Sequence, residues 1–191
     1  MSTEKILNLI AEAGLLKRVK RSGWWMLGMP FEESVADHSF RCAMIGYILA
    51  KMEGADTSKV LLMTLSGDLH ESRINDLHKV AHKYLDVKKA EAKVFREQIR
   101  DLPPAIRKEL GETREDYEKQ LSTESVIARD ADILECLIQA KEYHDLGYAG
   151  ADRFFRKGPK HLKTKSALKL WKKALKWDSR IWWESLTVFE R

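Results

Sequence analysis

Residues 34–52 read SVADHSFRCAMIGYILAKM and combine a helix-start signal with one continuous apolar face. Ser34 and Asp37 have the spacing of a capping box, in which each side chain accepts the backbone N–H of the other, although Glu or Gln is commoner than Asp at the second position. The residues that follow the spacing of a buried helix face are Val35, His38, Cys42, Ile45 and Leu49. The stretch therefore predicts a helix that opens at Ser34 and runs to about Met52.

The rest of the chain continues the helical pattern. Only four prolines and ten glycines interrupt 191 residues, and most of the others are helix formers. Further helices are expected over residues 3–15, 57–72, 76–85, 88–101, 123–144, 164–177 and 179–190. Strand-like alternation and internal repeats are absent from the sequence. The prediction is an all-α fold, a helical bundle of about seven to eight helices.

The composition sets the class of protein. A chain of 191 residues with 44% hydrophobic residues is long enough for one domain with a buried core, and wholesale disorder is excluded. The two cysteines, Cys42 and Cys136, exclude a disulfide framework, and no apolar run approaches the ~20 residues that span a bilayer. We expect one cytoplasmic domain over residues 1–191, with its core at about 6–148 and basic helices at 152–190 packed on it.

The net charge of +5 is unevenly spread. Residues 152–177 hold ten Lys or Arg and one acid, which is +9, so the rest of the chain carries −4. Such a segment can attract nucleic acid, but its apolar residues alternate with lysines as on an ordinary amphipathic helix. We expect a solvated helix face and rank nucleic-acid binding last. Trp177, Trp182 and Trp183 form either a dimer face or part of the core, and we expect core.

Polar residues stand at core-like positions of two predicted helices. A lone histidine such as His38 is more often a hydrogen-bonded core residue than a metal ligand. A carboxylate on a core stripe, as Asp68 is, costs free energy unless it pairs with a basic residue or binds a metal. Glu71 lies three residues further on, so both carboxylates face one pocket, and a cation there would remove their repulsion. An ion pair and a metal site both stay open at this point.

The predicted helix over residues 123–144 adds two carboxylates. Asp130 and Asp132 are two positions apart, about 200° around a helix, so one pocket cannot easily use both. Asp130 lies nearer the apolar stripe, and periodicity therefore favours Asp130. His78 and His82 have an i, i+4 spacing that can clamp a metal, but the adjacent lysines favour an exposed or partly buried helix face.

Three segments of the chain together resemble a known family. They are Glu33-Ser-Val-Ala-Asp37-His38-Ser39, Gly67-Asp68-Leu-His-Glu71-Ser-Arg-Ile-Asn75-Asp76 and Ala131-Asp132-Ile-Leu134. This pattern resembles the HD-domain metal-dependent phosphohydrolases, and within them the 5′-deoxynucleotidase-like branch. The segment Arg21-Ser-Gly-Trp24 is also similar to that branch. The resemblance runs from about Ile6 to Tyr148 and is thinner beyond.

The resemblance implies a site and an activity. It implies one divalent metal (Mn, Co, Zn, Ni or Mg) held by His38, Asp68 and Asp132, and so prefers Asp132 to the Asp130 that periodicity favours. The implied activity is hydrolysis of deoxyribonucleoside 5′-monophosphates to nucleoside and phosphate. Because dimers are common among such proteins, a homodimer is expected.

The resemblance also implies roles for four residues around the metal. Glu71 would assist proton transfer, and Asp76 would line the substrate pocket and accept a sugar hydroxyl. Arg21 would lie near the phosphate and Trp24 near the nucleoside.

One position departs from the family pattern. Where the family has the His of its HD pair, this chain has Gly67, which supplies no ligand and costs a helix interior up to ~1 kcal/mol relative to Ala. Three protein ligands with added waters still suffice for a divalent ion. His70 lies one turn on and leans toward Gly67, so it is a candidate substitute. The alternatives are a catalytically impaired nucleotide- or metal-binding protein, or an HD phosphohydrolase acting on another nucleotide.

Overall fold

The structure is a computed structural model that describes residues 3–30 and 32–186 of the chain. The helices of ten residues or more are α1 (Thr3–Leu15), α3 (Val35–Glu53), α4 (Thr57–Ser66), α6 (Val87–Ile99), α7 (Pro104–Lys119), α8 (Thr123–Asp145) and α10 (Lys165–Ala174). The shorter elements are α2 (Ser22–Trp25), α5 (Glu71–Ile74), α9 (Asp152–Lys157), η1 (Ala81–Lys83), η2 (Ala149–Ala151), η3 (Gly158–His161) and η4 (Glu184–Leu186). Within the described ranges the only β pairing is a single bridge between Lys20 and Ser34. The predicted all-α class is confirmed, with seven long helices.

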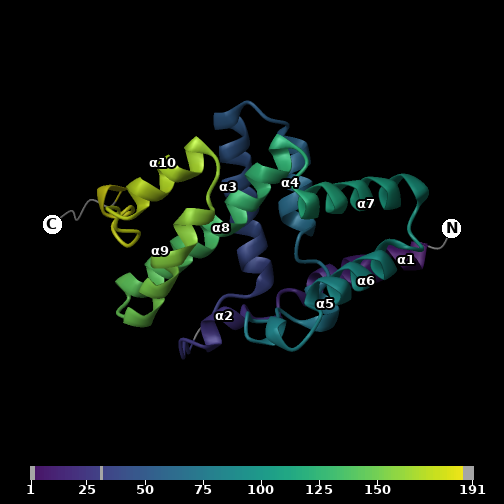
Figure 1. Ribbon diagram of the computed structural model, residues 1–191, viewed down its shortest axis with the longest axis horizontal. Coiled ribbons are helices and arrows are strands. Elements are labelled where there is room, and N and C mark those ends of the chain that lie inside the picture. Colours follow the sequence, from purple (N-terminus) through teal and green to yellow (C-terminus); the bar gives the residue numbers. More distant parts are fainter. Residues whose placement is uncertain (1–2, 31, 187–191) are drawn as a thin grey trace.

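Helices α3, α4 and α8 form the centre of the molecule. In Figure 1, α9 and α10 lie on one side of this centre, and α1, α6 and α7 lie on the other. The shared core includes Leu49, Val60, Ile127 and Leu134, none of which has exposed surface. Gly46 lets α3 approach α4 closely, because a Cβ there would stand 3.0 Å from the Val60 side chain. This packing holds the three helices that carry, or lead into, the polar residues of interest.

The start of α3 follows the predicted capping box. The Ser34 hydroxyl accepts the N–H of Asp37 at 3.1 Å, and the Asp37 carboxylate accepts the N–H of Ser34 at 2.8 Å. The helix ends at Gly54, whose φ of +72° gives the left-handed cap that glycine favours. These caps fix His38 in the first turn of the helix.

Two expected helices are wrong in this structure. The helix over residues 57–72 stops at Ser66, and a turn leads into the four-residue α5. The helix over residues 76–85 is reduced to η1, because Asn75 takes a positive φ of 62° and turns the chain out of helical geometry. One helix, α7, was not predicted. It starts at Pro104, since a proline at the first helical position loses no internal hydrogen bond.

The C-terminal part combines a confirmed prediction with a wrong one. Helix α10 buries Ala167 and Trp171 against the core and exposes its lysines, as the amphipathic pattern predicted. Residues 179–183 are not helical, and residues 187–191 lie outside the described ranges. The expected core positions of three tryptophans are also wrong, since Trp177, Trp182 and Trp183 are exposed.

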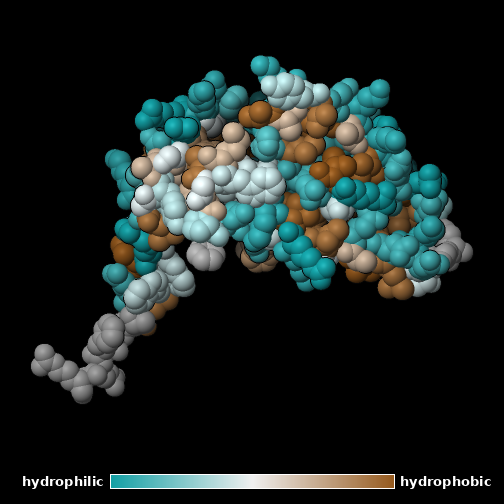
Figure 2. Space-filling model, turned by 90° about the horizontal axis from the view of Figure 1, so that it is seen from below, coloured by the Kyte–Doolittle hydropathy of each residue, from teal (hydrophilic) through white to brown (hydrophobic). Residues whose placement is uncertain are grey.

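The surface of the described residues mixes polar and apolar side chains. Seen from below in Figure 2, the hydrophobic residues gather mainly on the side of α5 and α6, between hydrophilic ones. Among residues 3–30 and 32–186, no helix has both the length and the apolar character needed to cross a membrane.

Candidate metal centre and active site

His38 lies between two aspartates. Its Nε2 stands 3.3 Å from Oδ1 of Asp132 on α8 and 3.5 Å from Oδ2 of Asp68, in the turn after α4. The imidazole is buried, whereas the two carboxylates keep about a quarter of their side-chain surface exposed (27% each). The structure thus brings three residues from distant parts of the sequence to one point, with access from solvent.

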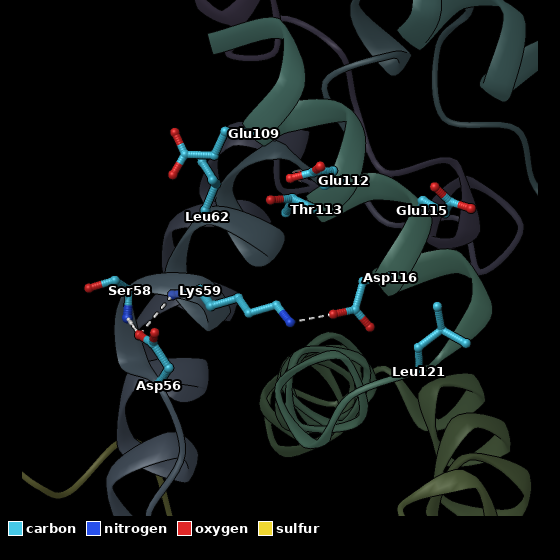
Figure 3. A pocket seen from close by; sticks show the side chains of 10 residues that line it. All are labelled: Asp56, Ser58, Lys59, Leu62, Glu109, Glu112, Thr113, Glu115, Asp116 and Leu121. Carbon is cyan, nitrogen blue, oxygen red and sulfur yellow. Dashed lines mark hydrogen bonds and ion pairs between the residues drawn. The ribbon is translucent and has the colours of Figure 1, made fainter. Parts of the chain in front are cut away.

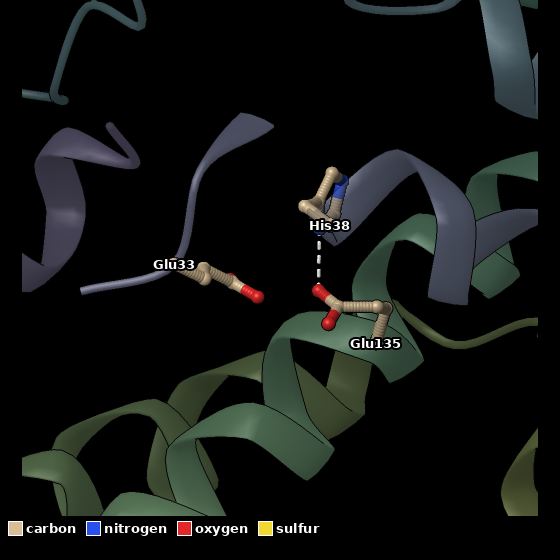
Figure 4. A group of neighbouring side chains, drawn as sticks. All are labelled: Glu33, His38 and Glu135. Atoms are coloured by element: carbon tan, nitrogen blue, oxygen red, sulfur yellow. Dashed lines mark hydrogen bonds and ion pairs between the residues drawn. The ribbon is translucent and has the colours of Figure 1, made fainter. Parts of the chain in front are cut away.

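The other ring nitrogen of His38 contacts a buried carboxylate. Nδ1 lies 2.5 Å from Oε2 of Glu135, which is fully buried. Figure 4 shows this contact between α3 and α8. Arg41 then binds Glu135 through Nε at 2.9 Å and Nη2 at 2.7 Å. A carboxylate on one imidazole nitrogen orients the ring and leaves the other nitrogen free to bind a metal.

Glu135 is a residue that sequence reasoning missed. A signal was available, because Glu135 follows Asp132 by three residues and so lies on the same side of α8.

A second donor set shares His38. Donor atoms of Glu33, His38 and Glu135 lie within 4.8 Å of one another, on the side where Glu135 binds Nδ1 (Figure 4). These carboxylates already have partners, since Glu33 accepts Nε1–H of Trp24 at 3.0 Å and Glu135 accepts Arg41. Asp68 and Asp132 are more exposed than Glu135 and line the smaller of the two cavities described below, so their side of His38 is better suited to a reactive metal.

Asp130, which periodicity favoured, has a different role. It is fully buried and accepts the backbone N–H groups of Lys163 at 3.0 Å and Thr164 at 2.6 Å. The Thr164 hydroxyl adds a further bond at 2.7 Å. Asp130 therefore anchors the start of α10, and the choice of Asp130 as the metal carboxylate was wrong in this geometry.

Glu71 and Asp76 line the same cavity as Asp68. Asp76 accepts the backbone N–H of Ser22 at 2.8 Å, while Arg21 Nη1 stands 3.7 Å from Asp68 and 3.9 Å from Asp76. Burial, with added repulsion from Asp68 and Asp76, raises the pKa of Glu71 to about 10. Burial therefore favours the protonated form of Glu71, which is the form that a general acid needs before it reacts.

The protonation of His38 follows from the same charges. Burial and the nearby Arg21 lower the pKa of His38, but bonds to Asp132 and Glu135 outweigh them and raise it to about 10. A neutral imidazole nitrogen with two carboxylate oxygens is a donor set that Zn, Mn and Co accept. His38 would have to give up its proton to hold an ion here, because a ligating imidazole must be neutral.

Two cavities meet at Asp76. One of about 360 Å³ is lined by residues that include Arg21, Trp24, Cys136 and Phe154. Within it Trp24 is almost fixed, because its ring packs 5.2 Å from Tyr143 and 4.7 Å from Phe154. The cavity therefore has one rigid aromatic wall beside a guanidinium group.

The second cavity, of about 170 Å³, lies on the Gly67 side. Its lining includes Asp68, Glu71, Asp132 and Arg129. His70 also lines it, but its Nε2 faces Glu91 at 3.6 Å and its Nδ1 faces Arg114 at 3.4 Å. Both ring nitrogens of His70 thus have partners other than the three presumed metal ligands.

The paired histidines at residues 78 and 82 do not form a metal clamp. His78 Nδ1 accepts the N–H of Ala81 at 3.3 Å, and His82 Nε2 lies 3.0 Å from the carbonyl of Leu77. They hold the turn around η1. Both are at least partly exposed, as expected, but they lie on a turn and not on the expected helix face.

The chain is similar to known proteins in both sequence and fold. A family model described as "HD domain" matches residues 13–171. The chain is 31% identical over 142 residues to 5′-deoxynucleotidase HDDC2 of Homo sapiens, covering 74% of this chain and 69% of that protein. It is 33% identical over 140 residues to the protein of the same name from Dictyostelium discoideum, covering 68% and 73%. A solved structure of a conserved hypothetical protein from Pyrococcus furiosus has a TM-score of 0.76 and 34% identity, covering 90% of this chain and 99% of that one.

The chain belongs to the HD-domain family. Among the HD phosphohydrolases it is related, at about 30% identity, to the HDDC2 5′-deoxynucleotidases.

Proposed function

We propose that this chain hydrolyses deoxyribonucleoside 5′-monophosphates to nucleoside and phosphate, with a divalent metal at His38, Asp68 and Asp132. The observation that carries the proposal is the approach of His38 Nε2 to both aspartates, at 3.5 and 3.3 Å, while Glu135 holds Nδ1. Relatives named 5′-deoxynucleotidase support the substrate class. A bound divalent ion supplies Lewis-acid charge and lowers the pKa of water.

The residues around the metal site bind the phosphate, transfer a proton and bind the sugar. Arg21 stands beside Asp68 and Asp76 and presents its guanidinium to the phosphoryl oxygens, where charge develops. Glu71, held neutral by burial, gives its proton to the departing 5′-oxygen. Asp76 keeps one oxygen on the Ser22 N–H and accepts a sugar hydroxyl with the other.

Trp24 accounts for a preference for deoxyribose. Its ring is buried, packed by Tyr143 and Phe154, and tied to Glu33 by its N–H, so it cannot retreat to admit an extra group. A 2′-hydroxyl needs both room and a hydrogen-bond partner, and burying it without a partner costs free energy. We therefore expect dAMP to be a better substrate than AMP.

Gly67 favours one alternative function. Because the glycine supplies no ligand, the protein would bind a nucleotide or metal without turnover if three ligands were too few. Phosphate release from dAMP, measured across Mn²⁺ and Co²⁺ concentrations, distinguishes the active hydrolase from the protein without turnover. Release supports the hydrolase, whereas bound dAMP without release at any metal level supports the impaired protein.

Three matched variants test which residues hold the metal. Asp68→Asn and Asp132→Asn should each lower phosphate release by roughly 100-fold or more, since each loses a charged ligand. Glu33→Gln should bind metal with the affinity of the unmodified chain. Loss of metal binding in Glu33→Gln, with retention in both aspartate variants, would place the metal at the Glu33–Glu135 side instead.

A further inference from the structure

The cavity of about 360 Å³ beside Arg21 has walls that the proposed function does not use. That function assigns the phosphate to Arg21 and the sugar to Trp24 and Asp76, and it leaves the base of the nucleotide without a partner. The unused walls come from the segment after α2 and from α9, and they include Met26, Leu27, Arg153 and Phe154.

Arg153 lies away from the point where the two cavities meet. Asp76 and Lys79 line both cavities, whereas Arg153 lines only the larger one. Arg21 stands 3.9 Å from Asp76, which is within ion-pair distance, but Arg153 forms no ion pair with Asp76. The sugar and phosphate groups therefore bind in one part of the cavity, and Arg153 belongs to another part.

The walls beside Arg153 are apolar and closely packed. The ring centroid of Phe154 lies 4.7 Å from that of Trp24, and a Cβ at Gly150 in η2 would stand 3.5 Å from the Leu27 side chain. Stacking on aromatic walls binds any base, because every base has a π face. These walls therefore account for binding of a base but not for a choice among bases.

The guanidinium of Arg153 is free to bind a ligand. The adjacent acid on α9, Asp152, is already bound by Nη2 of Arg156 at 2.6 Å. Within residues 3–30 and 32–186, no carboxylate lies within ion-pair distance of Arg153, and no hydrogen bond occupies its N–H groups. An exposed arginine with all its donors available thus stands beside an apolar wall.

On the basis of the proposed hydrolysis of deoxyribonucleoside 5′-monophosphates, we propose that this part of the cavity binds the base and that Arg153 selects guanine. A guanidinium presents two parallel N–H donors in a rigid fork. Guanine offers two acceptors, O6 and N7, on one edge, whereas adenine offers N7 beside the N6 amino donor. The fork of Arg153 can therefore pair fully with guanine, but it meets a second donor on adenine.

Steady-state kinetics at saturating Mn²⁺ test the selection. The KM for dGMP should be roughly fivefold or more below that for dAMP, at the low end of a bidentate contact because Arg153 is exposed. The two kcat values should be similar, since the base lies away from the reacting atoms. Arg153→Met should raise the KM for dGMP to that for dAMP. The matched control Arg156→Met changes an arginine of the same helix that does not line the cavity, and it should keep the preference.

Base analogues and a lysine variant distinguish base recognition from attraction by charge. The nucleotide dIMP keeps O6 and N7 and should bind like dGMP, whereas 7-deaza-dGMP lacks N7 and should bind like dAMP. Arg153→Lys keeps the charge without the fork and should lose the preference. Equal KM values for dGMP and dAMP in the unmodified chain would overturn the proposal. An equal loss for both nucleotides in Arg153→Met would also overturn it, because Arg153 would then attract the phosphate.

Binding without turnover distinguishes a failure of this proposal from a failure of the proposed function. Calorimetric titrations of the unmodified chain and Arg153→Met with dGMP and dAMP in EDTA measure the preference in the absence of hydrolysis. A guanine preference that depends on Arg153 supports the base site, with or without phosphate release in Mn²⁺. Release of phosphate from both nucleotides without any base preference would support the hydrolase and refute the base site.

Discussion

Asp130 and Asp132 stand two positions apart on α8 in different environments. Asp130 has no exposed surface and is satisfied by backbone N–H groups of residues 163 and 164. Asp132 is partly exposed and faces His38 and Arg129. Periodicity measures burial and so finds the anchoring carboxylate, whereas Asp132, the proposed metal ligand, lies where the core ends.

This contrast predicts opposite phenotypes. Asp130→Ala removes the buried acceptor of three partly buried donors and should lower the free energy of unfolding by about 2–4 kcal/mol. The protein that remains folded should keep its phosphate release. Asp132→Asn should change the unfolding midpoint little and abolish release. Urea titrations and a phosphate assay on both variants measure these effects, and equal losses of stability would contradict the assignment.

Gly67 is the residue that we expect to lower metal affinity most, because it supplies no ligand. A Cβ there would stand 3.1 Å from the backbone carbonyl of Met63, so a side chain requires this carbonyl to move by a few tenths of an ångström. Gly67→His should raise metal affinity roughly tenfold or more, because it adds a fourth ligand. Gly67→Ala is the matched control, since it adds the Cβ without a ligand. Equal affinities of the two variants in a calorimetric titration would show that position 67 does not face the metal.

Glu135 is expected to act through His38. Glu135→Gln keeps the shape but weakens the hold on Nδ1, and should lower metal affinity about 10–100-fold. The dependence of metal binding on pH distinguishes this role from loss of structure. With its carboxylate partner removed, His38 should lose its proton at a lower pH, so metal binding should begin at a lower pH. An unchanged pH profile would contradict the positioning role.

At the scale of elements, Asp116 joins three helices. Its carboxylate, on α7, binds Lys59 of α4 at 2.5 Å and accepts the N–H and hydroxyl of Ser122, the N-cap of α8, at 3.0 and 2.7 Å. Figure 3 shows the Lys59 contact in a cavity of about 530 Å³ between α4 and α7. None of the proposed site residues lines this cavity.

The Asp116 contacts predict a pH-dependent stability. Burial alone would raise the pKa of Asp116, but the bonds from Lys59 and Ser122 outweigh it and lower the pKa to about 2. A lowered native pKa stabilises the folded state above the ordinary value near 4, and that stabilisation is lost as pH falls from about 4 to 2. Asp116→Asn should therefore cost about 1–3 kcal/mol at pH 7 and progressively less below pH 4. Urea unfolding at several pH values measures the difference, and a constant difference down to pH 2 would refute the linkage.

The elements show which sequence signals suffice. Local signals predicted α3, because its capping box and core stripe agree. The same reasoning failed at residues 76–85, where the positive φ of Asn75 and the bonds of His78 and His82 to the turn decide the conformation. It also left out α7, which starts at Pro104.

At the scale of the molecule, the site exists only in the folded chain. Its presumed ligands come from residues 38, 68 and 132, and the packing of α3, α4 and α8 brings them together. Resemblance to the family selected these residues, including Asp132. It did not supply Glu135 or the partners of His70, since these depend on contacts between helices.

The central claim is that one divalent metal sits between His38, Asp68 and Asp132. Anomalous diffraction from crystals grown with Mn²⁺ and dAMP tests it most directly. The account predicts a single strong peak within bonding distance of His38 Nε2 and of both aspartates, with the nucleotide phosphate beside Arg21. A peak between Glu33 and Glu135, or no peak at saturating Mn²⁺, would contradict it.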